Sequence, residues 1–299
     1  MSIRFGVSPI AWINDDMPEL GAGTPLERVL SDASEIGFSG IELGGAFPRD
    51  PLALQSLLLE YGLDLVGGWY SGALLRRSVQ DEIAALQGHL GLLQALGCSV
   101  FIFAETSNAI HGDRGQPLTR TPTLSEAQWR SFGAALTDVA DYIHARGLRF
   151  AYHHHLGTVV DDSDDLRTFL AVTGSSVGLT VDTGHADLGG IDAVELIRTH
   201  PDRVAHVHCK DVRGGVFDRV SQAGGSFLDG VLAGMFTVPG DGRLDYGAVM
   251  RALAASDYSG WIIVEAEQDP ATAQPRLYAQ LGLRTLREQA AAAGLTETV

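Results

Sequence analysis

Residues 148–155 read Leu-Arg-Phe-Ala-Tyr-His-His-His, a short apolar run that ends in three adjacent histidines. Three later segments, 179–185, 204–211 and 261–267, also place polar residues at the end of an apolar run. Runs of this length, bounded by turn residues, are typical of buried strands. Because the carboxyl ends of parallel barrel strands open on one common face, the pattern predicts that these polar side chains meet in one pocket.

Apolar runs alternate with helical segments along the whole chain. Strands are expected at 3–7, 40–43, 64–70, 99–104 and 148–152 and in the three later runs, and helices at 24–37, 50–62, 78–97, 125–147, 163–173, 192–200 and 245–256. Eight such units in 299 residues favour an α/β fold, a parallel sheet closed into a (β/α)₈ TIM barrel. The competing open sheet would carry a glycine fingerprint after its first strand, and residues 5–10 lack one. We expect one barrel domain over 1–299, with an extra helical insertion near 214–236.

Capping residues predict where two of the helices begin. Thr24 as N-cap, Pro25 at the first helical position and Glu27 as the capping-box partner predict the start of the first helix. Ser125 and Gln128 form a second capping box, in front of a segment whose apolar residues recur every three or four positions.

Composition restricts the class of partner. The formal net charge is −16, which repels phosphate backbones, so nucleic acid is not an expected partner. The two cysteines, Cys98 and Cys209, exclude a disulfide framework and favour a reducing compartment. Neither a signal peptide nor an apolar run of membrane-spanning length is visible, so we expect a cytoplasmic protein without a membrane partner. The sequence leaves open whether the chain forms a homo-oligomer.

Four polar residues at successive strand ends form a candidate metal site: His153, Asp182, His208 and Glu265. Two imidazoles and two carboxylates suit Mn²⁺, Co²⁺, Fe²⁺ or Zn²⁺ and suit Ca²⁺ poorly. A single histidine is more often a packed core residue, but four such residues at four barrel strand ends favour a functional set. His155 shares a strand face with His153, so either can be the ligand, whereas the intervening His154 should face outward.

Further polar and aromatic residues should surround this metal: Trp12, Glu42, Trp69, Glu105, His185, Lys210, Asp211 and Glu267. Some of these have simpler interpretations. Lys210 and Asp211 can form a salt bridge at the rim, and the two tryptophans can belong to the core or form an apolar wall against a ring-shaped substrate. The segment 14–16, Asn-Asp-Asp, can bind substrate hydroxyls or simply make a turn, and a turn is the simpler interpretation.

The chain resembles the inosose dehydratases of the xylose-isomerase-like barrel superfamily along nearly its whole length. The resemblance rests on the segments 8–16, 152–160, 181–185, 206–213, 236–242 and 264–270. The motifs around Asp182 and His208 are common in the superfamily, whereas the triple histidine and Glu267-Gln268-Asp269-Pro270 are more specific to the dehydratases. The superfamily usually holds its metal with Glu, Asp, His and Glu, and here His153 takes the first position.

One segment departs from the dehydratase pattern. Residues 42–48 read Glu-Leu-Gly-Gly-Ala-Phe-Pro, where the family resembles Glu-Leu-Gly-Asn-Lys-Phe-Pro. Gly45 and Ala46 therefore replace two polar side chains. If those side chains touch substrate in the family, the departure alters which inosose, or which reaction, this chain serves.

The resemblance implies that the protein is a carbon–oxygen lyase that removes water from an inosose, a cyclic polyol ketone, to give a trihydroxycyclohexane-dione in inositol catabolism. The implied cofactor is a divalent metal, Mn²⁺ or Co²⁺ before Zn²⁺ or Fe²⁺. Proton transfer would fall to catalytic residues among His155, His185, Lys210 and Glu267, and substrate binding to Trp12, Glu42, Trp69, Glu105 and Asp211. A metal-dependent keto-sugar isomerase or epimerase, which acts through an enediolate, is the alternative enzyme, and a catalytically inactive polyol-binding barrel is the alternative outside enzymes.

Overall fold

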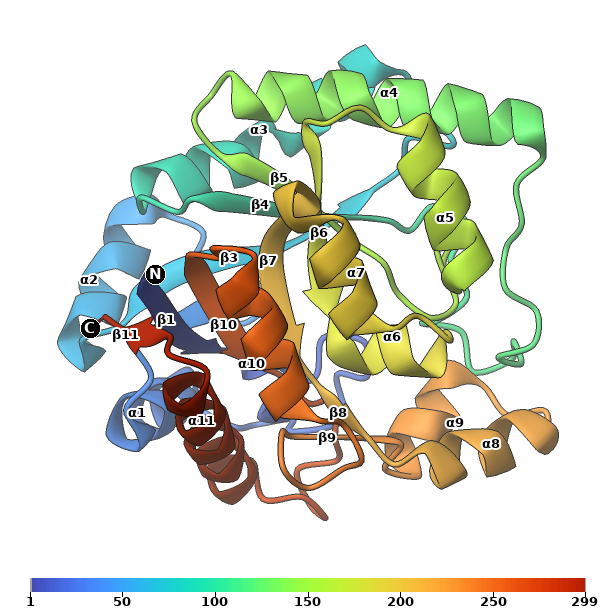
Figure 1. Ribbon diagram of the computed structural model, residues 1–299. Coiled ribbons are helices and arrows are strands. Elements are labelled where there is room, and N and C mark those ends of the chain that lie inside the picture. The colour runs from blue at the N-terminus through green and yellow to red at the C-terminus, as the bar shows by residue number, and fades with distance from the viewer. Residues whose placement is uncertain (1, 299) are drawn as a thin grey trace.

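Eight parallel strands form a closed barrel in the computed structural model, which describes residues 2–298. The first and last barrel strands close it, with Phe5 in register with Ile262 and Val7 with Val264. This arrangement confirms the predicted TIM barrel (Figure 1). The barrel strands are β1 (Ser2–Val7), β2 (Gly40–Leu43), β3 (Asp64–Gly72), β4 (Val100–Glu105), β5 (Arg149–His153), β6 (Val177–Asp182), β7 (Val204–Cys209) and β10 (Gly260–Val264).

Helices cover the outside of the barrel (Figure 1). The helix α4 buries Trp129, Phe132, Leu136, Val139 and Ile143, the residues that recur at helical spacing in the sequence. The covering helices are α1 (Leu26–Ile36), α2 (Pro51–Tyr61), α3 (Val79–Ala95), α4 (Glu126–His144), α5 (Ser163–Val172), α7 (Ala193–Thr199), α10 (Tyr246–Ala255) and α11 (Pro275–Ala292).

The two predicted capping boxes have different outcomes. Ser125 and Gln128 form theirs, with the Ser125 side chain accepting from the Gln128 backbone and the Gln128 side chain accepting from the Ser125 backbone. The box at Thr24 is wrong. The N-cap of α1 is Pro25, whose side chain cannot form a capping hydrogen bond. The first helical residue is therefore Leu26, one residue later than predicted.

Short elements decorate the barrel between and beyond its main units. They are η1 (Pro9–Ala11), α6 (Thr183–Leu188), η2 (Pro201–Arg203), β8 (Asp211–Val212), α8 (Gly214–Gln222), α9 (Phe227–Leu232), β9 (Phe236–Thr237) and β11 (Thr296–Glu297). The helices α8 and α9 lie within the segment expected to be helical near 214–236. They share a second apolar cluster with Met235 and Phe236, to which Phe227 and Leu228 contribute.

Alternation along β5 sets the direction of the histidines. Tyr152 packs against the helix layer, with ring centroids 6.3 Å from Phe132 and 4.4 Å from Phe169. The next residue, His153, lines the cavity at the end of the barrel. His154 is buried outside the cavity lining, and neither of its ring nitrogens has a hydrogen-bond partner within residues 2–298.

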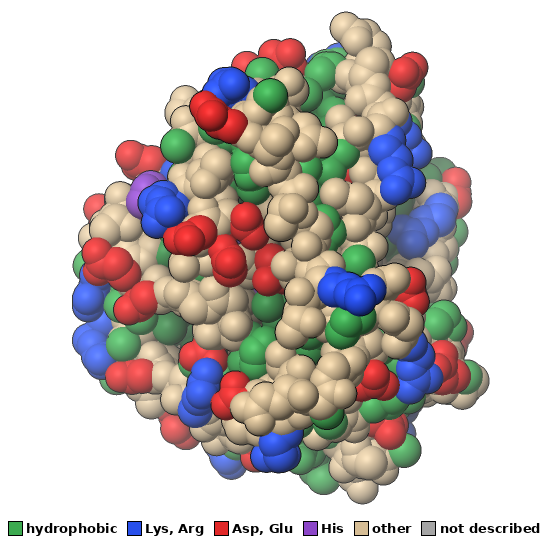
Figure 2. All heavy atoms as spheres, turned by 90° about the vertical axis from the view of Figure 1, so that its right-hand side faces the viewer, with side chains coloured by type: hydrophobic (Ala, Val, Ile, Leu, Met, Phe, Trp, Pro, Cys, Tyr) green, Lys and Arg blue, Asp and Glu red, His purple; other side chains and the backbone are tan. Residues whose placement is uncertain are grey.

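None of the helices within residues 2–298 combines the length and the apolar character needed to cross a membrane. On the face drawn in Figure 2, basic side chains are scattered among acidic ones. That face therefore offers no extended basic surface.

Candidate functional site

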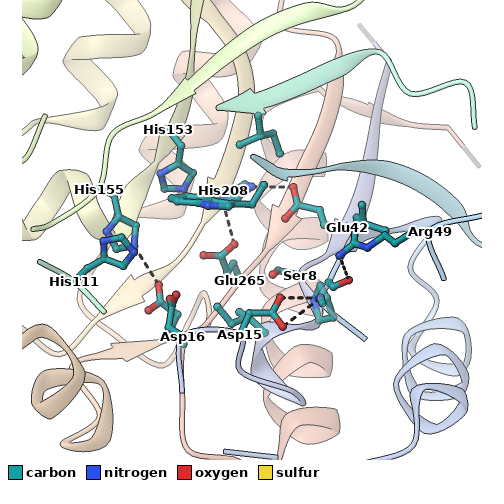
Figure 3. Close-up of a pocket in the computed structure, with 18 residues that line it drawn as sticks. Ser8, Asp15, Asp16, Glu42, Arg49, His111, His153, His155, His208 and Glu265 are labelled. Atoms are coloured by element: carbon teal, nitrogen blue, oxygen red, sulfur yellow. Dashed lines mark hydrogen bonds and ion pairs between the residues drawn. The ribbon is translucent and has the colours of Figure 1, made fainter. Parts of the chain in front are cut away.

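A cavity of about 430 Å³ lies where the barrel strands end (Figure 3). Strand ends and the loops after them supply its walls, as expected for a TIM barrel. The lining residues are Ser8, Pro9, Ile10, Asp15, Asp16, Glu42, Leu43, Gly44, Gly45, Arg49, Trp69, Ile102, His111, His153, His155, His208, Glu265 and Glu267.

The four predicted metal ligands lie together: His153, His208 and Glu265 line this cavity, and Asp182 is buried beside them. His153 Nε2 lies 3.6 Å from Asp182 Oδ2, and His208 Nδ1 lies 3.7 Å from the same oxygen. Glu265 Oε2 lies 3.0 Å from His208 Nδ1. His155 lies elsewhere, with Nε2 3.9 Å from Glu267 Oε1. The structure thus places His153, not His155, beside Asp182.

The chemistry of this quartet fits a divalent ion. Asp182 caps α6, so its Oδ1 accepts from the backbone N–H groups of Gly184 and His185, both at 2.9 Å. Its Oδ2 is buried without a hydrogen-bond partner among the described residues. His153 donates from Nδ1 to the His154 carbonyl at 2.8 Å, which leaves a lone pair on Nε2. A carboxylate oxygen and an imidazole nitrogen are thus both available as ligands, and a divalent metal bound between them would satisfy both atoms.

The four predicted proton-transfer residues also lie together. Lys210 Nζ lies 2.6 Å from Glu267 Oε1 and 3.0 Å from His185 Nε2, and the ring centroids of His155 and His185 are 3.8 Å apart. Lys210 also contacts the metal quartet, at 2.6 Å from Glu265 Oε1 and 3.5 Å from Asp182 Oδ2. Its ammonium group therefore joins the two clusters.

Buried charges set the protonation of both clusters. Burial alone would lower the pKa of Lys210, but the carboxylates of Asp182, Glu265 and Glu267 outweigh it and raise that pKa well above its usual value. Burial alone would raise the pKa of Asp182, but the ammonium group of Lys210 holds that pKa well below its ordinary range. The pKa of His155 is lowered by burial and then by His185, which favours a neutral ring able to accept a proton.

An aromatic surface covers the proton-transfer residues. The Phe227 ring, from the inserted helix α9, lies 5.0 Å from the His155 ring and stacks on His185 at 6.0 Å. On the other side, Trp69 meets His153 and His155 edge-on at 5.2 and 5.7 Å. Trp69 is one of the predicted substrate residues that does line the cavity, as is Glu42.

Three other predicted substrate residues lie outside the cavity lining, and each has a structural partner. The Trp12 indole donates to Asp32 at 3.0 Å. Glu105 accepts backbone N–H groups, at 2.6 Å from Leu74 and 3.0 Å from Ser107. Asp211 accepts the backbone N–H groups of Val212, Gly240, Gly242 and Leu244. Loop and core contacts thus occupy polar atoms of Trp12, Glu105 and Asp211, and their contact with substrate stays a prediction.

The sequence leaves two interpretations of residues 14–16 open, and it does not predict other lining residues, such as His111. The Asn14 side chain accepts from the N–H groups of Asp16 and Met17 at 2.9 and 2.7 Å, which makes the predicted turn. That turn presents Asp15 and Asp16 to the cavity. His111 comes from the long loop before α4, where no local pattern in the sequence indicates a site.

Asp16 gives a pH-dependent prediction for the metal-free protein. Burial, followed by the nearby Glu267 and Asp15, raises the pKa of Asp16 from 3.8 to about 7. The native state therefore binds this proton more tightly than the unfolded chain, so the resulting stabilisation is complete below pH 4 and is lost as the pH rises through 7. Asp16→Asn should gain roughly 2–3 kcal/mol of unfolding free energy relative to wild type between pH 5 and pH 8. Urea denaturation at both pH values measures this change, and an equal difference at the two would contradict it.

Comparison with known proteins identifies the family. The xylose isomerase-like TIM barrel model matches residues 30–289. The rhizopine catabolism protein MocC of Rhizobium meliloti is 45% identical over 294 residues, which cover 98% of this chain and 90% of that protein. The inosose dehydratase of Salmonella typhimurium is 38% identical, with 96% of each chain covered, and that of Geobacillus thermodenitrificans is 37% identical, with 96% and 97% covered.

A solved structure supports the fold alone. An L-ribulose 3-epimerase superposes with a TM-score of 0.69 at 18% identity, covering 98% of this chain and 96% of that one. The family and the buried histidine and carboxylate groups together indicate a divalent metal. The chain belongs to the xylose isomerase-like TIM barrel family, in the group that includes the inosose dehydratases.

Proposed function

We propose that the protein is a metal-dependent inosose dehydratase that uses Mn²⁺ or Co²⁺ and takes part in inositol catabolism. One observation carries this proposal: two clusters of side chains meet at one cavity. The first is the metal quartet, in which one carboxylate oxygen has no hydrogen-bond partner among the described residues. The second is the set of proton-transfer residues, which Lys210 links to the quartet. The full-length similarity to inosose dehydratases supports the substrate class.

The charge of the cavity favours a neutral polyol over an anionic sugar. Its lining includes the carboxyl groups of Asp15, Asp16, Glu42, Glu265 and Glu267. Arg49 is the one Lys or Arg residue of the lining, and its guanidinium donates to the Gly44 carbonyl at 3.1 Å. Carboxylates accept hydrogen bonds from hydroxyl groups and repel phosphate or carboxylate groups, so this cavity suits a ring that carries many hydroxyls.

The reaction needs one proton removed and one supplied. A base takes the proton from the carbon beside the ketone, an acid protonates the hydroxyl on the next carbon, and water leaves to give an enol that relaxes to a dione. When bound, the divalent ion supplies Lewis-acid stabilisation of the charge that develops on the ketone oxygen. His155 and Glu267 line the cavity and can reach substrate, whereas His185 and Lys210 lie behind them.

The atoms of these residues suit those roles. His155 donates from Nδ1 to the Leu156 carbonyl at 2.7 Å, so its Nε2 carries a lone pair that can accept a proton. Glu267 holds Lys210 through Oε1, while its Oε2 is buried without a hydrogen-bond partner among residues 2–298. We infer that His155 and Glu267 transfer the protons and that Lys210 and His185 fix their positions.

Dehydration and epimerisation share the first proton abstraction, so one experiment separates them. Metal-loaded protein is incubated with scyllo-inosose in D₂O, and the products are analysed by NMR and mass spectrometry. Loss of one water with formation of a dione supports the dehydratase. Deuterium incorporation into an intact polyol ketone, or an epimer without water loss, would favour the isomerase or epimerase instead. If neither change is observed, the remaining interpretation is a polyol-binding barrel without catalytic activity.

The departure at Gly45 has a structural reason and gives a prediction. The Gly45 N–H donates to the Asp15 carboxylate at 2.9 Å, and a Cβ on residue 45 would lie 2.5 Å from Asp15 Oδ1. Gly45→Asn should therefore displace Asp15 from the cavity wall and raise the KM for scyllo-inosose roughly tenfold, the size of one hydrogen bond to a charged group. Gly88→Asn is the matched control, because a Cβ at Gly88 would meet no atom within 4 Å and this glycine lies outside the cavity lining. Equal KM values for wild type and Gly45→Asn would exclude a role for Asp15 in binding.

A further inference from the structure

Glu42 makes two hydrogen bonds at the end of β2 that its predicted role in substrate binding does not explain. Its Oε1 lies 2.9 Å from Nε2 of His206 and 2.9 Å from Nε2 of His208. All three side chains are buried, with 6% of Glu42, 1% of His206 and 3% of His208 exposed. Figure 3 shows Glu42 and His208 facing each other across this contact.

The second nitrogen of His208 faces the metal quartet. Its Nδ1 lies 3.0 Å from Glu265 Oε2 and 3.7 Å from Asp182 Oδ2, and it has no hydrogen-bond partner among the described residues. A carboxylate can only accept, so the contact with Glu42 requires the proton of a neutral His208 on Nε2. That tautomer leaves the Nδ1 lone pair directed toward Asp182 and Glu265, where a metal ligand is needed.

The same three residues could in principle hold an ion themselves. Glu42, His206 and His208 offer ligand atoms that all lie within 4.8 Å of one another, and His208 would then bridge two metals. However, both Nε2 atoms already have a hydrogen-bond acceptor in Glu42 Oε1. By contrast, His208 Nδ1 and the neighbouring Asp182 Oδ2 have no hydrogen-bond partner among the described residues. The unsatisfied atoms therefore mark one metal position, on the Nδ1 side of His208.

We propose that Glu42 is a positioning residue that holds His208 with its proton on Nε2, so that the protein binds one divalent ion through Nδ1. A carboxylate in this position also makes the imidazole a stronger ligand, and loss of such a partner typically weakens metal binding about 10–100-fold. The inference rests on the metal site of the proposed function, but it does not depend on which reaction the protein catalyses.

The test is a titration of metal-stripped protein with Co²⁺, in which visible absorption reports the ligand field and elemental analysis gives the stoichiometry. Wild type should bind one equivalent. Glu42→Ala should bind one equivalent about 10–100-fold more weakly. Glu42→Gln should lose less affinity, because its amide oxygen still accepts one N–H. Glu82→Gln is the matched control, since Glu82 is an equally buried carboxylate that accepts from Tyr70 and Ala73 outside the cavity lining. It should keep wild-type affinity.

A direct measurement of the tautomer protects the test against a variant that fails to fold. In wild type loaded with diamagnetic Zn²⁺ and labelled with ¹⁵N-histidine, His208 should show a protonated Nε2 and an unprotonated, metal-bound Nδ1. The opposite tautomer would overturn the proposal, as would unchanged affinity in Glu42→Ala. Two equivalents in wild type, one of them lost in both Glu42→Ala and His206→Ala, would establish the bridged site instead. A wild type that binds no Co²⁺ would refute the proposed metal site itself, an outcome distinct from these.

Discussion

Asp182→Asn is expected to abolish tight metal binding and to lower kcat/KM for scyllo-inosose by about a thousandfold, because a bound metal supplies several kcal/mol of transition-state stabilisation. Asn keeps a side-chain oxygen that can accept from the N–H groups of Gly184 and His185, so the cap of α6 is preserved. The loss should therefore come from the missing charge on Oδ2 and not from unfolding. Calorimetric titration with Mn²⁺ and steady-state kinetics measure the two effects.

Asp192→Asn is the matched control for that variant. Asp192 also caps a helix, α7, and accepts from the Glu195 N–H at 3.0 Å, but its side chain is exposed, whereas that of Asp182 is buried beside the other predicted ligands. It should change neither metal affinity nor turnover. Asp182→Asn with wild-type affinity and activity would remove the proposed site, whereas loss of both in Asp192→Asn would show that an Asp-to-Asn change at a helix cap acts through the fold and not through the metal site. Asp182→Ala should lower the unfolding free energy more than Asp182→Asn does, because it also removes the N-cap of α6, which contributes about 1 kcal/mol to stability.

Lys210→Met should have the second largest effect, on both stability and activity. Lys210 is fully buried against Asp182, Glu265 and Glu267, so its removal leaves three buried carboxyl groups without their cation. Breaking such a buried pair typically costs about 3–5 kcal/mol, and we expect this loss of unfolding free energy in the metal-free protein. We expect turnover to fall at least about a hundredfold, the lower end for loss of an acid–base arrangement.

The chain offers an unusually clean probe of this residue, because Lys210 is its only lysine. Labelling with ¹⁵N-lysine should give one side-chain ammonium signal, protected from exchange because the group is buried and hydrogen-bonded. Its assignment needs no further variant. A Lys210→Met protein as stable as wild type, or an ammonium signal that exchanges as freely as that of a solvated lysine, would contradict the arrangement described here. Added Mn²⁺ should partly restore the stability of Lys210→Met, since a divalent ion neutralises two of the same carboxylates.

The fold follows from the sequence because strand and helix periodicities alternate along the chain, interrupted by the insertion near 214–236 that the sequence itself predicts. The segment 125–147 carries both a capping box and a helical repeat, and both are present in α4. Local sequence signals do not predict the exact helix start where two neighbouring residues can each act as the N-cap. Thr24 and Pro25 together fit a helix start, but the structure uses Pro25 as the cap. The six-residue α6 has no predictive periodicity, because it is too short and is begun by the side chain of Asp182 itself.

The candidate site follows from the sequence only as far as strand ends can indicate it. The barrel rule brings His153, Asp182 and His208 to one edge, but it does not say which of His153 and His155 meets Asp182. Side-chain partners decide the remaining roles. Glu42 and Glu105 both lie near the carboxyl ends of barrel strands, yet Glu42 accepts from two histidines and Glu105 accepts from backbone N–H groups. Such partners depend on loop conformation, which sequence periodicity does not encode.

The central claim is that a divalent ion at the barrel end is needed to remove water from a cyclic polyol ketone. The most direct measurement is an assay of purified, metal-stripped protein with scyllo-inosose, before and after addition of Mn²⁺ or Co²⁺, with the dione followed by ultraviolet absorbance and by a mass loss of one water. We predict no dione from the stripped protein and full turnover once metal is restored. Dione formation that persists in the stripped protein, or none at all from protein shown to hold metal, would contradict the account.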